Sequence, residues 1–150
     1  MPVIKDSTYR APFLFGGSHL QTILPTLFRK VDGVVYRRER IDTPDGDFVD
    51  LDFSSVGSPR AVLVSHGLEG KSDRAYMKGM VRAFNRRGWD GVAFNFRGCS
   101  GEPNRTATTY HSGKTEDLHA VVEYLLSKKG YTDISLVGFS LGGNLTLKYA

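Results

Sequence analysis

The stretch ISLVGFSLGGN, residues 134–144, joins a mainly apolar run to a serine that stands between glycines. The run is typical of a buried strand, and the residues from Leu141 onward begin a helix. A tight turn from strand to helix lifts one side chain above the edge of a sheet, and flanking glycines let the backbone turn without side-chain clashes. The pattern Gly138-x-Ser140-x-Gly142 therefore predicts a nucleophile elbow with Ser140 at its apex.

The segments before this elbow predict a mostly parallel, doubly wound α/β sheet that is entered through an antiparallel hairpin. The hairpin spans residues 33–53, with TPDGD as its turn. Apolar runs that indicate buried strands occupy residues 61–65 and 91–95, and helical periodicity occupies residues 72–88 and about 115–130. Ser72 or Asp73 is the expected cap of the first helix. In the usual strand order, the strand at 134–138 would be a bare edge.

Two regions follow from this pattern. We expect residues 1–32 to form an irregular N-terminal segment and residues 33–150 to form the N-terminal part of one α/β domain. The last helix stops at Ala150 without a glycine, a cap or a basic last turn. We therefore expect the chain to be a fragment, with the rest of the domain beyond residue 150.

Composition indicates one globular domain with a real core, because 40% of the 150 residues are hydrophobic and 24% are charged. The single cysteine, Cys99, cannot form an internal disulfide, which favours a reducing, cytoplasmic setting. Neither a membrane span nor a signal peptide is predicted.

The formal net charge is +4, and much of it lies in FRK (28–30) and YRRER (36–40). A solvated strand face explains these residues, with at most weak contact to an anionic membrane surface. No basic stripe with interleaved aromatic residues occurs, so no nucleic-acid partner is expected. Nothing in the sequence predicts an oligomeric state.

An acyl-transfer site needs a second oxyanion donor beside the residue that follows the nucleophile. HGLEG, residues 66–70, supplies a glycine turn directly after the strand at 61–65. The N–H of Leu68 is then the candidate partner of the N–H of Leu141. His66 could be taken for a general base, but its place at a strand end favours a role in holding the loop through a backbone hydrogen bond.

A competing interpretation of this loop is nucleotide binding. SHGLEGKS, residues 65–72, nearly matches the phosphate-binding pattern G-x-x-x-x-G-K-[ST]. The segment that would bind the nucleotide is Gly67–Ser72. Ser65 stands where the first glycine is needed. The strand at 91–95 ends in Asn95, so it offers no carboxylate for Mg²⁺.

Six blocks in order resemble the YheT-like α/β hydrolases (AB hydrolase family 4). They are HLQTILP, PDGDFVDLD, HGLEG, NFRGCSGEPNR, YHSGKTEDL and GFSLGGN, and the resemblance runs from about His19 to Ala150. The resemblance implies a serine carboxylic-ester hydrolase, and some eukaryotic members act on acylglycerols, phospholipids or medium-chain ethyl esters. It places the nucleophile at Ser140 and the oxyanion donors at Leu68 and Leu141.

The elbow and its loop need support from neighbouring residues. We expect this support from Gly138, Gly142, Gly143, His66, Gly67 and Arg97. Arg97 could also bind a substrate carboxylate, but bracing the loops by hydrogen bonds is the favoured role. Asp117 and Glu116 fall in the first turn of a helix, where they would offset its dipole. Cys99 is expected to be a small loop residue, and Tyr110 and His111 to line the mouth of the site without being essential.

The catalytic triad is incomplete in this sequence. In this fold the chain order is serine, acid, histidine, yet the ten residues after Ser140 contain neither an acid nor a histidine. His19, His66, His111 and His119 all precede the nucleophile. The acid and the base are therefore expected beyond Ala150, and residues 1–150 alone should be inactive.

The expected substrate is a small acyl ester, and no metal or organic cofactor is expected. Both hydrolysis and acyl transfer to an alcohol are open. The alternative is a non-catalytic α/β-hydrolase scaffold that keeps the elbow and serves in binding.

Overall fold

The computed structural model describes residues 8–13 and 15–150 and divides the chain into two compact units at residues 30 and 31. The second unit, from Val31 to Ala150, contains the sheet. The first unit contains helix α1, Ser18–Phe28. Each unit is described by itself.

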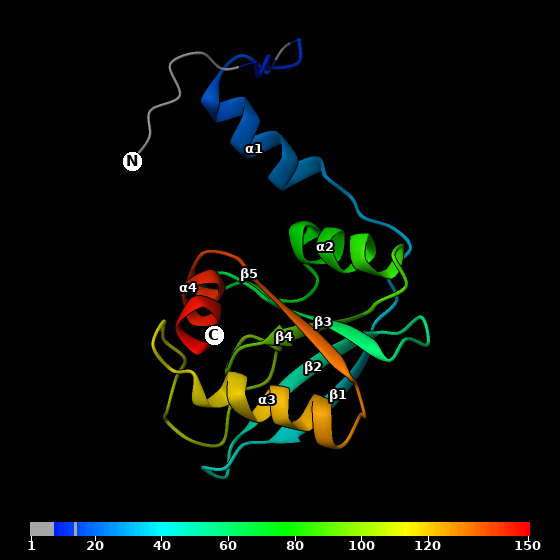
Figure 1. Ribbon diagram of the computed structural model, residues 1–150. Coiled ribbons are helices and arrows are strands. Elements are labelled where there is room, and N and C mark those ends of the chain that lie inside the picture. Colours follow the sequence, from blue (N-terminus) through cyan, green and yellow to red (C-terminus); the bar gives the residue numbers. More distant parts are fainter. Residues whose placement is uncertain (1–7, 14) are drawn as a thin grey trace. The chain divides into compact units, whose positions relative to one another are not determined.

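The sheet has five strands in the order β1-β2-β4-β3-β5 (Figure 1). Their bounds are β1 Arg37–Asp42, β2 Phe48–Ser54, β3 Arg60–Ser65, β4 Asp90–Asn95 and β5 Asp133–Gly138. The pairs β1–β2 and β2–β4 are antiparallel, whereas β3 is parallel to both β4 and β5. The predicted hairpin and parallel strands are confirmed, and β5 lies at an edge as expected.

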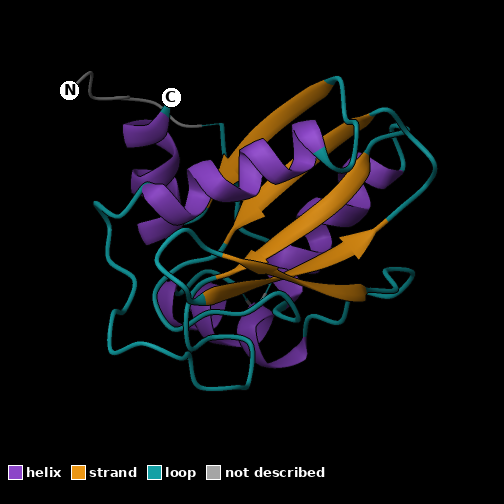
Figure 2. Cartoon of the chain, turned by 90° about the horizontal axis from the view of Figure 1, so that it is seen from below, coloured by secondary structure: helices purple, strands orange, loops and turns teal. Residues whose placement is uncertain are grey.

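Helices cover both faces of this twisted sheet (Figures 1 and 2). Helix α2, Ala75–Asn85, packs on one face; α3, Glu116–Ser127, and α4, Leu141–Tyr149, pack on the other. The α2 side buries Val62, Val64, Met77, Val81 and Ala93. The α3 and α4 side buries a larger cluster that includes Leu51, Leu63, Val92, Phe94, Leu118, Val121, Leu125 and Leu145. The doubly wound arrangement is therefore confirmed.

The parallel register brings three strand ends to one edge of the sheet. Ser65 at the end of β3 pairs with Phe94 of β4 and with Gly138 of β5. The loops that begin at residues 66, 96 and 139 therefore leave the sheet at the same edge. This is the edge at which open α/β sheets place their sites.

Helix α2 begins later than the sequence predicted. Its N-cap is Arg74, without a side-chain capping bond, so neither Ser72 nor Asp73 caps it. The reason lies beneath the loop, where the Ser72 N–H donates to Asn95 Oδ1 at 2.9 Å and the Ser72 hydroxyl donates to Asp52. Because Ser72 is bonded to this buried polar cluster, it does not cap the helix.

The prediction of an irregular N-terminal segment is wrong for Ser18–Phe28, which form α1. Pro25 lies inside this helix, where its missing N–H removes one backbone bond. The hydroxyls of Thr22 and Thr26 donate to the carbonyls of Ser18 and Thr22, so both hydroxyls are satisfied within the helix. Within the described residues, every helix is too short or too polar to cross a bilayer.

The arginines of β1 are paired across the hairpin. Arg38 lies opposite Asp52, and Arg40 lies opposite Asp50. Each guanidinium forms a bidentate ion pair with its carboxylate, with both hydrogen bonds 2.8 Å long. Both arginines stay partly exposed, with 45% and 36% of their side chains accessible. The strand is therefore a partly solvated face whose charge is largely neutralised.

Candidate active site

Ser140 stands at the turn between β5 and α4 in a conformation that few L-residues adopt. Its φ of 53° and ψ of −115° lie outside the common regions, and its side chain is exposed. Such a conformation costs about 1–3 kcal/mol and persists only when surrounding structure enforces it. The Phe139 N–H donates to the Ser65 carbonyl at 3.0 Å, and the Gly142 N–H donates to the His66 carbonyl at 3.1 Å. These bonds tie the turn to the end of β3 on both sides of the serine.

The glycines of the turn allow backbone segments to touch. A Cβ on Gly138 would lie 2.2 Å from the Gly142 carbonyl oxygen, and a Cβ on Gly142 would lie 2.5 Å from the His66 carbonyl oxygen. Gly143 is less tight, with 3.2 Å to the Gly138 carbonyl oxygen. Because the opposing atoms are backbone, no side-chain rotation could relieve the first two contacts. Glycine is required at these positions by close approach.

The loop HGLEG reaches the serine directly. A Cβ on Gly67 would lie 3.3 Å from Ser140 Cβ and 3.9 Å from Ser140 Oγ. Residues 67–70 form a turn in which the Gly70 N–H donates to the Gly67 carbonyl at 3.0 Å. Among the described residues, the N–H groups of Leu68 and Leu141 have no acceptor. The two predicted oxyanion donors are thus unpaired, and their loops meet at Ser140.

His66 is fully buried beneath this loop, and both of its ring nitrogens are used. Nδ1 lies 2.6 Å from the Gly67 carbonyl, and Nε2 accepts the Phe96 N–H at 3.2 Å. Burial lowers the pKa of His66, and the bond to Gly67 only partly opposes that shift. A neutral imidazole with Nδ1 protonated satisfies both contacts. His66 therefore holds the loop to the strand end and has no nitrogen available to serve as a base.

Two other histidines are also bonded elsewhere. His111 Nδ1 accepts the Gly113 N–H at 3.1 Å, and His119 Nδ1 lies 3.0 Å from the Tyr149 hydroxyl. No hydrogen bond in the described residues joins a histidine or a carboxylate to the Ser140 hydroxyl. The described geometry thus presents a serine and two free donors without a base.

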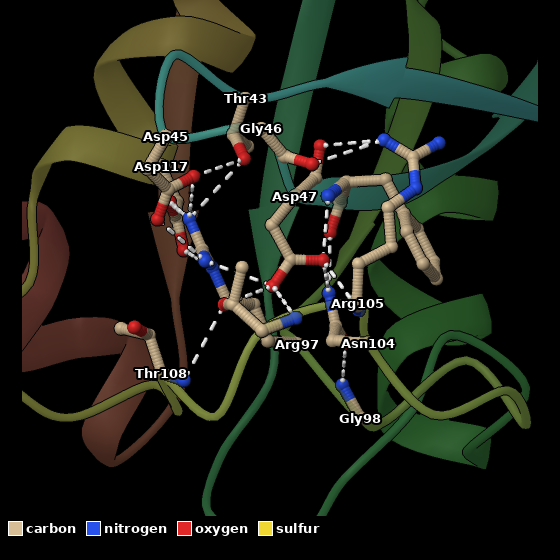
Figure 3. A network of polar contacts seen from close by, with 12 residues as sticks. Thr43, Asp45, Gly46, Asp47, Arg97, Gly98, Asn104, Arg105, Thr108 and Asp117 are labelled. Atoms are coloured by element: carbon tan, nitrogen blue, oxygen red, sulfur yellow. Dashed lines mark hydrogen bonds and ion pairs between the residues drawn. The ribbon is translucent and has the colours of Figure 1, made fainter.

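Arg97 lies two residues beyond β4 with only 2% of its side chain exposed. Its Nε and both terminal nitrogens donate to carboxylates and a hydroxyl, as Figure 3 shows. The partners are Asp117, Asp45, Asp47 and Thr43. The hydrogen bond to Asp117 is the main cause that raises the pKa of Arg97. All five N–H groups are engaged within the protein, so no donor remains for a substrate carboxylate.

Asp47 is a hub that the sequence analysis missed. Its buried carboxylate accepts hydrogen bonds at Oδ1 and Oδ2 from the hairpin, from Arg97 and from the loop that follows β4 (Figure 3). The six donors are the N–H groups of Phe48, Arg105 and Thr106, the Thr106 hydroxyl, Asn104 Nδ2 and Arg97 Nη1. Burial alone would raise the pKa of Asp47, but these hydrogen bonds outweigh it and lower the pKa. A signal was present, because PDGDFVDLD carries four aspartates, more than a hairpin turn needs.

Asp117 has a partner that its expected place in the first helical turn does not imply. It lies in the first turn of α3, yet it is buried and receives Arg97 Nε at 2.8 Å and Nη2 at 2.6 Å. Asp117 therefore pairs with Arg97 while it keeps its place in the first turn of α3. The ion pair joins the start of α3 to the end of β4.

Cys99 lies in the glycine-rich loop after β4 and is partly buried. Burial raises the pKa of its thiol, which disfavours a reactive thiolate. This agrees with its expected role as a small loop residue.

The loop at Gly67–Ser72 lacks the open cradle that a phosphate-binding loop presents. The N–H groups of Gly67, Gly70 and Ser72 donate to protein acceptors. Lys71 pairs with Asp73 at 2.9 Å. A phosphate-binding loop needs free N–H groups and a serine hydroxyl available to Mg²⁺, and here these three N–H groups and the Ser72 hydroxyl are already engaged. The geometry counts against nucleotide binding.

A comparison with protein families identifies the arrangement. The model of the alpha/beta hydrolase fold matches residues 60–150, which contain β3 to α4, HGLEG and the elbow. The chain belongs to the alpha/beta hydrolase fold family.

Curated relatives support the resemblance to the YheT-like group within this family. YheT of Escherichia coli (strain K12) is 47% identical over 136 residues, covering 87% of this chain and 40% of that protein. Embryogenesis-associated protein EMB8 of Picea glauca is 34% identical, covering 92% of this chain and 33% of that protein. Phospholipase ABHD3 of Mus musculus is 32% identical, covering 99% and 38%. The chain thus spans 33–40% of the length of these relatives.

Solved structures share the fold. The Pyrococcus furiosus esterase Pf2001 superposes with a TM-score of 0.65 at 23% identity, covering 80% of this chain and 50% of that chain. The alpha/beta hydrolase GrgF from Penicillium sp. sh18 gives 0.65 at 20% identity, covering 77% and 41%. At this identity the likeness concerns the fold.

Proposed function

We propose that the chain supplies the nucleophile and the oxyanion hole of a serine carboxylic-ester hydrolase. The observation that carries the proposal is the exposed Ser140 at a φ of 53°, where two loops meet that each offer an N–H without an acceptor among the described residues. A nucleophile at a strained strand-to-helix turn is the constellation of this chemistry. The names of two relatives, phospholipase ABHD3 and a yeast monoacylglycerol lipase, also denote ester hydrolases.

In the proposed mechanism, Ser140 Oγ attacks the ester carbonyl carbon while a histidine outside residues 1–150 takes the hydroxyl proton. The carbonyl oxygen becomes an oxyanion, and the N–H groups of Leu68 and Leu141 stabilise it. Collapse of this intermediate breaks the bond to the alcohol, which leaves with the proton from the histidine. Water or a second alcohol then attacks the acyl-enzyme and releases the acid or a new ester. This chemistry requires no metal or organic cofactor.

The test uses the full-length chain and a fluorophosphonate probe. We expect intact-mass spectrometry to detect one adduct on the wild type, no adduct on Ser140→Ala, and an unchanged adduct on the control Ser127→Ala. Ester hydrolysis by Ser140→Ala should fall roughly a million-fold, as in other enzymes that lose this nucleophile. A folded wild-type chain without an adduct would refute the esterase proposal and favour a binding scaffold.

A further inference from the structure

The turn at Gly67–Gly70 contains four consecutive backbone N–H groups, and three of them have acceptors. The Gly67 N–H donates to the Tyr76 hydroxyl at 3.2 Å, and the Glu69 N–H donates to the Tyr110 hydroxyl at 2.9 Å. The Gly70 N–H closes the turn on the Gly67 carbonyl. Of these four N–H groups, only that of Leu68 is left without an acceptor among the described residues. Two tyrosine hydroxyls thus accept hydrogen bonds from the N–H groups on either side of Leu68.

Tyr76 contacts both loops of the site. It lies in the first turn of α2, and its ring meets the Phe139 ring edge-on, with centroids 4.8 Å apart. Phe139 directly precedes Ser140, so this side chain touches the elbow as well as the turn. Gly70 permits the approach, because a Cβ there would lie 2.8 Å from the Tyr76 hydroxyl oxygen. Tyr76 is therefore placed to set the position of one loop relative to the other.

Tyr110 approaches the turn from the loop between β4 and α3. Its ring stacks on Phe96 at 5.1 Å and 18°, and the Phe96 ring meets the His66 ring at 4.4 Å. The Tyr110 hydroxyl binds the N–H of Glu69, whose φ of 51° is left-handed although the residue is not glycine. Such a conformation in a non-glycine residue needs tertiary contacts to hold it. The Tyr110 hydroxyl is a contact of this kind.

We propose that Tyr76 and Tyr110 are positioning residues of the oxyanion hole. Their hydroxyls hold the N–H groups of Gly67 and Glu69 inward, so the Leu68 N–H is the one donor of the turn left for the substrate. The proposal rests on the proposed function of Ser140. The oxyanion forms only as the reaction proceeds, so a mispositioned donor should lower kcat and leave substrate binding nearly unchanged.

The test compares Tyr110→Phe and Tyr76→Phe in the full-length chain, because phenylalanine keeps the ring contacts and removes only the hydroxyl. Losing an oxyanion donor outright costs about 100- to 1,000-fold in kcat, and a donor that is displaced but present should cost less, roughly tenfold. We expect this loss with KM within about twofold. The matched control is Tyr149→Phe, which removes a hydroxyl that contacts His119.

A second readout separates positioning from general loosening. A trifluoromethyl ketone forms an oxyanion adduct with a catalytic serine, whereas the corresponding amide binds without forming one. Both tyrosine variants should lose affinity for the ketone about as much as they lose kcat, and should bind the amide as the wild type does. Equal losses for both ligands, or a variant that does not fold, would overturn the positioning role for that residue.

A wild-type rate in both variants would overturn the inference while leaving the proposed function intact, provided that Ser140 still takes the fluorophosphonate. If the wild type takes no adduct at all, the proposed function fails first and the inference fails with it. A glycine rescue gives a further check. Glu69→Gly in the Tyr110→Phe background should restore part of kcat, because glycine adopts a left-handed φ without the hydroxyl contact.

Discussion

Two regions near the same edge of the sheet are built in opposite ways. The elbow and the HGLEG turn rest on glycines, and at Gly138 and Gly142 a Cβ would lie 2.2–2.8 Å from neighbouring backbone atoms. The region around Arg97 and Asp47 consists of paired charges, and Arg97, Asp47 and Asp117 among them are buried. Among the described residues, the first region presents an exposed serine and unpaired N–H groups. In the second region the charged groups are already paired with one another.

The contrast separates what a reacting group needs from what a buried charge needs. A nucleophile and its oxyanion donors must remain available, so their neighbours are held by backbone contacts and by the Tyr76 and Tyr110 hydroxyls, which do not compete for them. A buried carboxylate or guanidinium without partners costs several kcal/mol, so Arg97, Asp47 and Asp117, here called the brace, are all paired. The brace then fixes the loop after β4, which carries Tyr110 to the HGLEG turn.

Among the changes that test this comparison, Gly138→Ala should have the largest effect on the rate, because it breaks the glycine-built region. The new Cβ would meet the Gly142 carbonyl oxygen at 2.2 Å, so the backbone around Ser140 must move. A displacement of about 1 Å can cost 100-fold in rate, and we expect kcat/KM to fall by at least about that factor. Gly16→Ala, where nothing lies within 4 Å of the new Cβ, is the control. A folded Gly138→Ala enzyme within tenfold of the wild-type kcat/KM would contradict the close-packing argument.

Two aspartates that bind the same arginine sharpen the charged side of the comparison. The Asp47 side chain is fully buried and that of Asp45 is 44% exposed. Asp47→Asn replaces an acceptor oxygen with a donor among six donors, and we expect it to lower the free energy of unfolding by about 3–5 kcal/mol. Asp45→Asn should cost about 1 kcal/mol or less, because exposed ion pairs contribute little. Urea denaturation of both full-length variants measures the difference, and equal losses would show that burial does not decide it.

The smallest effect concerns His66, which lies in the glycine-built region but is buried like the brace. Burial lowers its pKa in the folded chain from the ordinary 6.5, so below that pH the unfolded chain binds more protons. The contribution of His66 to the free energy of unfolding should therefore be fully present above pH 6.5. It should be lost as the pH drops through the folded-state pKa. Asp45 and Asp47, with pKa values lowered from 3.8, lose their contribution only in stronger acid.

Urea denaturation between pH 7.5 and 5 tests this expectation, with His66→Gln as the variant that cannot titrate. The slope of stability against pH in this range should be shallower in His66→Gln than in the wild type. Identical slopes would mean that His66 does not contribute to the pH dependence, and the neutral-imidazole assignment would be wrong.

Much of the architecture could be predicted because it depends on local pattern. The hairpin at TPDGD, the three parallel strands and the serine turn each follow from residues adjacent in sequence. The start of α2 could not be predicted in the same way, because Ser72 is held by Asn95 and Asp52 from other strands. Arg97 was expected to brace the loops, but Asp47 was missed as its partner for the same reason, since the two residues are 50 residues apart.

The sequence by itself determined that residues 134–144 form a strand, a serine turn and a helix, because apolar runs and glycines act over a few neighbouring residues. It also indicated Leu68 and Leu141 as the candidate donors by their places in the two loops. Only the tertiary structure decided which donors stay unpaired, because that depends on hydroxyls brought in by Tyr76 and Tyr110. Hydrogen bonds between distant segments depend on how the sheet aligns its strands, which patterns among neighbouring residues do not specify.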